Sequence, residues 1–86
     1  MTMLNQLKSY EIARIVTFEN ESEVKKKFVS KGILEGSIVR IISSFGLITF
    51  DVDSKIFSVS NGIAKNVRVI KVKYRFKEVI KYEKES

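Results

Sequence analysis

The sequence of 86 residues contains no cysteine, no histidine and no proline. Without cysteine and histidine the chain has no disulfide, and it has no thiolate or imidazole to act as nucleophile, general base or soft-metal ligand. Without proline it has no cis-proline switch and no polyproline docking segment. A glycine-rich phosphate-binding signature is also missing. These absences predict a binding protein that is not an enzyme and needs no cofactor.

The sequence also lacks the segments that direct a chain into a membrane. Its first residues do not combine a charged region with an apolar core, so they do not resemble a secretory signal peptide. No stretch approaches the roughly 18 consecutive apolar residues of a membrane-spanning helix. We therefore expect a cytoplasmic protein, and the absence of disulfides fits a reducing compartment.

The residues that are present are typical of one small β-rich domain. Hydrophobic residues make up 44% of the chain, which is too much for a disordered protein, and the length allows a single core. Isoleucine, valine and aromatic residues dominate, and strands favour them. The net charge of +6 predicts an acidic partner, nucleic acid or an anionic membrane surface. A charge of this size also serves solubility alone.

Apolar patterns and turn residues divide the chain into about five strands and one helix. The strands are predicted at residues 11–18, 37–43, 47–53, 56–59 and 67–72, and the helix at 21–31. Asn20 is the expected N-cap, with Glu23 completing a capping box, and Gly32 is the expected C-cap. Gly36 marks a tight reversal, and Gly62 marks a turn leading into one helical turn. This spacing predicts a mainly β, small closed barrel with one inserted α-helix.

The last predicted strand carries two apolar sets in conflicting phase. Val67 and Val69 fall on the same side as Lys71, whereas Ile70 and Val72 begin an alternation in the opposite phase. Both sets cannot point inward, so we expect a β-bulge or a break near residues 69–71. The barrel is therefore placed at residues 1–72. Residues 73–86 are expected to form a basic C-terminal extension, as a strand continuation or a frayed helix.

Three segments carry a family resemblance. They are residues 7–16 (LKSYEIARIV), 28–39 (FVSKGILEGSIV) and 64–69 (AKNVRV). The first is similar to the Ala-Arg-Ile strand of the ferrous iron transport protein A (FeoA) family, which follows a leucine and a short turn. The second resembles that family's leucine-glycine-leucine and proline-glycine elements, and the third its closing Ala-x-x-Ile-x-Val. The resemblance covers about residues 4–72, with the segments in the family's order.

The resemblance implies an SH3-like barrel that acts as a cytoplasmic accessory of the ferrous iron transporter FeoB, a membrane protein with a GTP-binding domain. Through that partner the chain would lie at the inner face of the membrane. The same barrel also occurs at the end of iron-dependent repressors. The chain departs from the family at three places. Ser9-Tyr10 occupies the position of the family's early Pro-Gly, and Glu35 occupies that of its second proline. Residues 60–63 (SNGI) replace a charged run.

The candidate partner-binding residues are basic and come from two regions. They are Lys25, Lys26, Lys27 and Lys31 of the predicted helix, and Lys71, Lys73 and Arg75 of the final strand. An acidic partner, anionic lipid headgroups or simple solvation would each account for them. Asp51 and Asp53 alternate on one strand, but two carboxylates without a third ligand make a poor cation site, so no metal site is predicted.

Two alternatives to the transporter partnership remain open. The first is a basic barrel that binds nucleic acid, since residues 74–77 (YRFK) mix aromatic and basic side chains. In a strand, however, those two kinds of side chain point to opposite faces. The second is weak self-association through the C-terminal strand.

Overall fold

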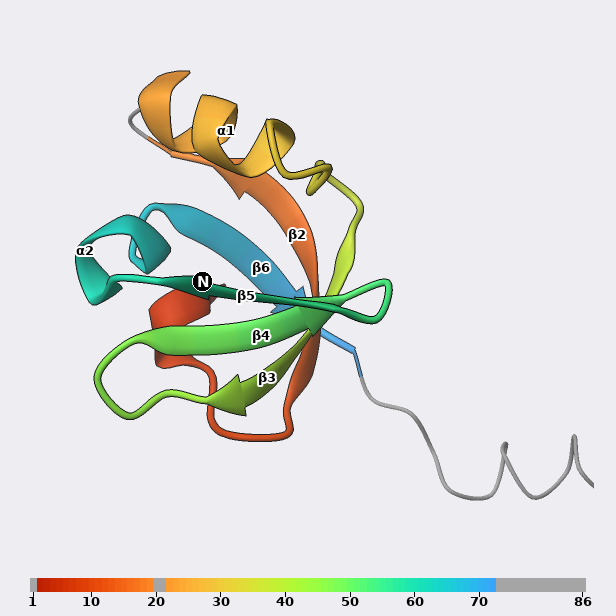
Figure 1. The fold of residues 1–86 in the computed structure, drawn as a ribbon, viewed down its shortest axis with the longest axis vertical. Coiled ribbons are helices and arrows are strands. Elements are labelled where there is room, and N and C mark those ends of the chain that lie inside the picture. Colours follow the sequence, from red (N-terminus) through yellow and green to blue (C-terminus); the bar gives the residue numbers. More distant parts are fainter. Residues whose placement is uncertain (1, 20–21, 73–86) are drawn as a thin grey trace, which may run out of the picture.

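The structure is a computed structural model that describes residues 2–19 and 22–72. Six strands and three short helices follow one another along this part of the chain (Figure 1). The strands are β1 (Thr2–Met3), β2 (Ile12–Phe18), β3 (Ile38–Ser43), β4 (Ile48–Val52), β5 (Lys55–Val59) and β6 (Val67–Lys71). The helices are the 3₁₀ turn η1 (Leu4–Gln6), α1 (Ser22–Val29) and α2 (Asn61–Ala64).

All six strands form one antiparallel sheet in the order β1-β6-β2-β3-β4-β5. Strands β2 to β5 pair as a simple meander, and β6 returns to pair with both β1 and β2. The sheet curls into a small barrel, with α1 lying over one end (Figure 1). The ladder of the described residues has two ends, β1 and β5, so the barrel is not the closed ring expected from the sequence.

The prediction of a mainly β domain with an early helix is confirmed, with differences at its edges. Strand β1 and the turn η1 were not predicted. Helix α1 ends at Val29, two residues earlier than expected, and Asn20, its predicted N-cap, lies outside the described residues. Gly62 does not form an open turn but lies within α2, where Ser60 is the N-cap and accepts a hydrogen bond from the Ile63 amide.

Two glycines shape the connection from α1 to β3. Gly32 has φ of +82° and Gly36 has φ of +94°, both in the left-handed region that favours glycine. Beside Gly32, the Ile33 amide donates to the Phe28 carbonyl at 3.0 Å, which ends the helix. The Gly36 amide donates to the Ile15 carbonyl at 2.7 Å and so ties the reversal to β2.

The core is built around a row of four phenylalanines. The rings of Phe28 and Phe50 lie 6.2 Å apart with planes only 5° from parallel, so α1 is stacked directly on β4. Phe18 flanks one end of the row and Phe57 the other. Fully burying a phenylalanine side chain contributes roughly 1.5–3 kcal/mol. This row therefore fixes the position of the helix.

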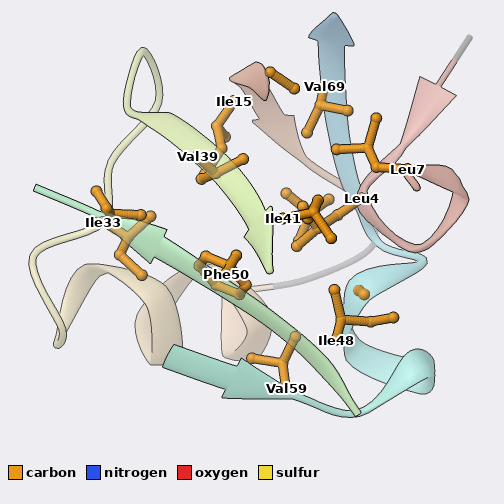
Figure 2. Close-up of a cluster of buried hydrophobic side chains, with 14 of the residues drawn as sticks. Leu4, Leu7, Ile15, Ile33, Val39, Ile41, Ile48, Phe50, Val59 and Val69 are labelled. Carbon is orange, nitrogen blue, oxygen red and sulfur yellow. The ribbon is translucent and has the colours of Figure 1, made fainter. Parts of the chain in front are cut away.

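The first residues of the described chain close the core from another side. Leu4 and Leu7 are both buried, and Figure 2 shows them pointing into the same apolar interior as Ile41. Strand β1 holds this segment in place by pairing Thr2 with Val69. A two-residue strand has no pattern of its own in the sequence, which explains why it was not predicted.

The sequence predicted a β-bulge or a break near residues 69–71, and the structure shows no bulge there but an end of β6 at Lys71. The pairing of β6 with β2 is regular over Val69, Ile70 and Lys71, where the strand ends. Val69 is buried and Ile70 is 56% exposed, so the phase of Val69 faces the core and the phase of Ile70 faces outward. The irregularity lies instead in β2, where Val16 is the extra residue between two consecutive pairs.

Tyr10 occupies a strained position in the turn before β2. Its φ is +72°, its side chain is 80% exposed, and its amide donates to the Ile41 carbonyl at 2.7 Å. For a residue with a Cβ atom the left-handed conformation costs about 1–2 kcal/mol. The hydrogen bond to β3 therefore holds a conformation that glycine would adopt without strain.

We predict that Tyr10→Gly raises the free energy of unfolding by about 0.5–1 kcal/mol. Relief of the left-handed strain exceeds the entropy that glycine adds to the unfolded chain. Urea denaturation measures the change. Ser9→Gly is the control, because Ser9 has no positive φ, and it should lower stability slightly. A Tyr10→Gly protein less stable than wild type would contradict the strain assigned to this turn.

Candidate functional site

The four lysines predicted for the helix separate onto two flanks, and Lys31 lies in the turn after α1. Lys25 and Lys26 line a shallow hollow on one flank. Lys27 and Lys31 line a groove on the other, where the helix faces β5. The helical rotation of about 100° per residue places neighbours in the sequence on different sides. The lysine run is therefore not one uniform surface.

The groove between α1 and β5, here called the α1–β5 groove, has an apolar floor and a basic rim. The half-buried Phe57 forms its floor, and the buried core residues Phe28, Ile33, Phe50 and Val59 lie beneath. Lys27 and Lys31 form the rim on the helix side, and the Lys31 Nζ lies 6.0 Å from the centre of the Phe57 ring. This distance allows a cation–π interaction, which orients the ammonium group toward β5.

A smaller hollow extends the α1–β5 groove toward the turn between β4 and β5. Lys31 and Phe57 line both hollows, and Lys55 and Asp53 join them in the second. Three lysines, Lys27, Lys31 and Lys55, thus surround the half-buried Phe57. Sequence reasoning missed Lys55 and Phe57 as members of this surface, because only the curl of the sheet brings β5 beside the helix.

The three groove lysines carry charge that no described acidic side chain neutralises. The ion pairs recorded within residues 2–19 and 22–72 are Arg40 with Asp51, Arg68 with Glu19, and Lys71 with Glu11. All three join residues of the sheet or residues that directly flank β2. The α1–β5 groove is therefore a place where three lysines without a recorded ion pair surround the half-buried Phe57, with Asp53 as the nearby carboxylate.

The basic residues predicted near the end of the chain have a different setting. Lys73 and Arg75 lie outside the described residues. Lys71 ends β6, and its Nζ lies 3.1 Å from a carboxylate oxygen of Glu11. The other Glu11 oxygen accepts a hydrogen bond of 2.6 Å from the Lys8 amide. This amide and the Lys71 ammonium lower the pKa of Glu11, the amide having the larger effect. Lys71 thus already has an acidic partner within the chain.

We predict that Glu11→Gln lowers the melting temperature at neutral pH, and that the difference from wild type disappears in acid. A carboxylate whose pKa is lowered by folding stabilises the fold above its ordinary pKa, and that contribution is lost as pH falls through the folded-state value. Thermal melts from pH 7 downward measure the difference. Glu23→Gln, on the exposed side of α1, should show a smaller one. A gap for Glu11→Gln that persists unchanged into strong acid would contradict the electrostatic assignment.

The two aspartates considered for a cation do not act together. The Asp51 carboxylate accepts hydrogen bonds from the Arg40 guanidinium at 2.9 and 3.1 Å. Asp53 lies in the turn between β4 and β5. Within residues 2–19 and 22–72 no group of three histidine, cysteine or acidic side chains is placed to hold a metal ion. No helix in this part of the chain is long and apolar enough to span a membrane.

Comparison with known proteins gives a family match and several structural neighbours. The model of the FeoA domain family matches residues 2–71. An iron uptake regulatory protein (FeoA) is 24% identical with a TM-score of 0.77, over 83% of this chain and 96% of that one. A FeoA-like protein from Clostridium acetobutylicum is 21% identical with a TM-score of 0.74, over 87% and 94%. No curated protein matches the sequence.

A second kind of neighbour shares the barrel within a longer chain. A manganese-dependent transcriptional repressor is 18% identical with a TM-score of 0.75, over 81% of this chain but only 40% of the repressor. At these identities the likeness concerns the fold alone. It confirms the predicted SH3-like small barrel.

Proposed function

The chain belongs to the FeoA family, and on this premise we propose that it is a non-enzymatic accessory protein that binds and modulates the ferrous iron transporter FeoB. The match of the FeoA domain model to residues 2–71 carries the proposal. The family takes its name from ferrous iron transport, and the resemblance of three sequence segments implies FeoB as the partner. Binding to its cytoplasmic part would place the chain at the inner face of the membrane.

The proposed role rests on surface contacts and requires no iron held by this chain. The α1–β5 groove supports it, because a partly exposed aromatic ring, Phe57, lies among three lysines, and aromatic residues are enriched at protein interfaces. Charged groups at such a rim mainly raise the association rate and set the specificity. We therefore assign Lys27, Lys31 and Lys55 as the basic contacts, with Lys25 and Lys26 outside the contact.

We predict that the chain binds the cytoplasmic part of FeoB encoded in the same genome, with a dissociation constant of about 50 μM or tighter. Isothermal titration calorimetry measures the affinity, and the rate of GTP hydrolysis with and without the chain reports modulation. The full-length manganese-dependent repressor is the control, since it shares the barrel but lies outside the proposed role. No binding at about 100 μM by a folded chain, or equal binding by the repressor, would contradict the proposal.

Neither alternative from the sequence gains support from a described feature. The nucleic-acid hypothesis depended on residues 74–77, and self-association on the same C-terminal strand; both segments lie outside the described residues. A nucleic-acid complex would weaken steeply with added salt, since binding releases counterions. A gel-shift titration at low and high salt tests that hypothesis separately.

A further inference from the structure

Strand β5 ends the sheet, and one of its edges has no partner among the described strands. Its other edge pairs with β4 through a tight two-residue turn in which Val52 stands opposite Lys55. Asp53 and Ser54 form this turn with φ of +52° and +69°. Positive φ at both central residues defines the type I′ turn, which sets the hydrogen-bond pattern of the whole hairpin.

That pattern leaves two residues of β5 with free backbone groups. In a hairpin with a two-residue turn, the flanking pair, here Val52 and Lys55, is hydrogen bonded, and the pairs then alternate. Phe57 and Val59 therefore bond to β4, whereas the amides and carbonyls of Ile56 and Ser58 point away from it. No backbone hydrogen bond from these two residues to another described residue is recorded.

The two faces of β5 offer different side chains to a strand that would pair with this edge. Phe57 and Lys55 share the inner face, together with Lys27 and Lys31 across the α1–β5 groove. Ile56 lies on the outer face and is 68% exposed. Side chains of an added strand alternate in the same way. They would meet lysines on one face and isoleucine on the other.

We propose that the free edge of β5 binds an extended, acidic polypeptide segment of a partner protein as an additional strand of the sheet. The partner's backbone pairs with the amides and carbonyls of Ile56 and Ser58. Its acidic side chains lie against Lys27, Lys31 and Lys55, and its alternate, apolar side chains lie beside Ile56. Main-chain hydrogen bonds supply affinity in this mode of recognition, and the alternating side chains supply specificity.

The combination of features favours a polypeptide over other anionic ligands. A lipid headgroup or a nucleic-acid phosphate satisfies the lysines, but it does not use a ladder of amides and carbonyls or an exposed isoleucine. Only an extended peptide chain matches all three. The proposal concerns the chemistry of the bound segment, so it stands or falls independently of whether FeoB is the protein that carries it.

The test uses the full chain and a synthetic capped heptapeptide of alternating valine and glutamate, followed by NMR. We expect shift changes and slowed hydrogen exchange at the amides of Ile56 and Ser58, together with shifts of Lys27 and Lys31. A peptide with lysine in place of each glutamate should not bind. No response at β5, or an equal response to the lysine peptide, would overturn the proposal.

Two pairs of variants distinguish binding at the β5 edge from nonspecific electrostatic attraction. Lys27→Glu with Lys31→Glu should weaken binding about tenfold, whereas Lys25→Glu with Lys26→Glu alters the same charge on the other flank and should change it less than about twofold. Ile56→Pro removes the outward amide and leaves the bonds to β4 in place, so it should abolish binding, while Ile56→Ala should retain it.

Each result has a defined meaning. Equal losses from the two lysine pairs would show nonspecific attraction, and undiminished binding by a folded Ile56→Pro protein would show that the edge is not used; either result overturns the proposal. If Ile56→Pro fails to fold, the exchange rates of Ile56 and Ser58 in the wild-type complex decide the point. Binding of the chain to phosphatidylglycerol vesicles through Lys27 and Lys31, without a response to the peptide, would assign the surface to lipid instead.

Discussion

The stacking of Phe28 on Phe50 is the contact on which the arrangement of the surface depends. Helix α1 has only eight described residues, and an isolated helix shorter than about 12 residues is marginal in water. Its position is therefore set by packing, and over residues 23–29, whose burial is described, Phe28 is the one fully buried side chain. Lys27 precedes Phe28 in the helix, and Lys31 lies in the turn directly after the end of α1 at Val29. The same stack that holds the helix thus aims both lysines at β5.

The local features of the fold could be predicted because each has a cause within a few residues. Gly32 ends the helix and Gly36 makes the reversal through backbone angles that other residues adopt only with strain. Buried and half-buried residues alternate along β4, because one face of the strand points into the core and the other toward solvent. The short strand β1 and the bulge at Val16 have no such local cause. They arise from pairing with β6, which is distant in the sequence, so no window of sequence indicates them.

The candidate site also combines features that the sequence could predict with features that it could not. Composition and the lysine run predicted a basic surface, and the segment resemblance predicted the barrel. The sequence could not show that Lys27 and Lys31 separate from Lys25 and Lys26, because that depends on which side of α1 is buried. The sequence also could not show that Lys55 of β5 lies beside Lys27 and Lys31. Lys71 illustrates the converse, since a basic residue with no acidic neighbour in the sequence is paired with Glu11, which is distant along the chain but adjacent in the fold.

The position of β6 between β1 and β2 also governs the order in which the barrel can assemble. Strands β3, β4 and β5 are consecutive neighbours and close only short loops, so they can pair early. Strands β1 and β2 must wait for β6, the last strand along the described chain, before they gain their shared neighbour. Long-range pairing of this kind slows folding, since loop-closure entropy is lost before contacts form. During synthesis β1 and β2 are thus made before β6 but are protected only after it, and the edge of β2 stays open until β6 has been made.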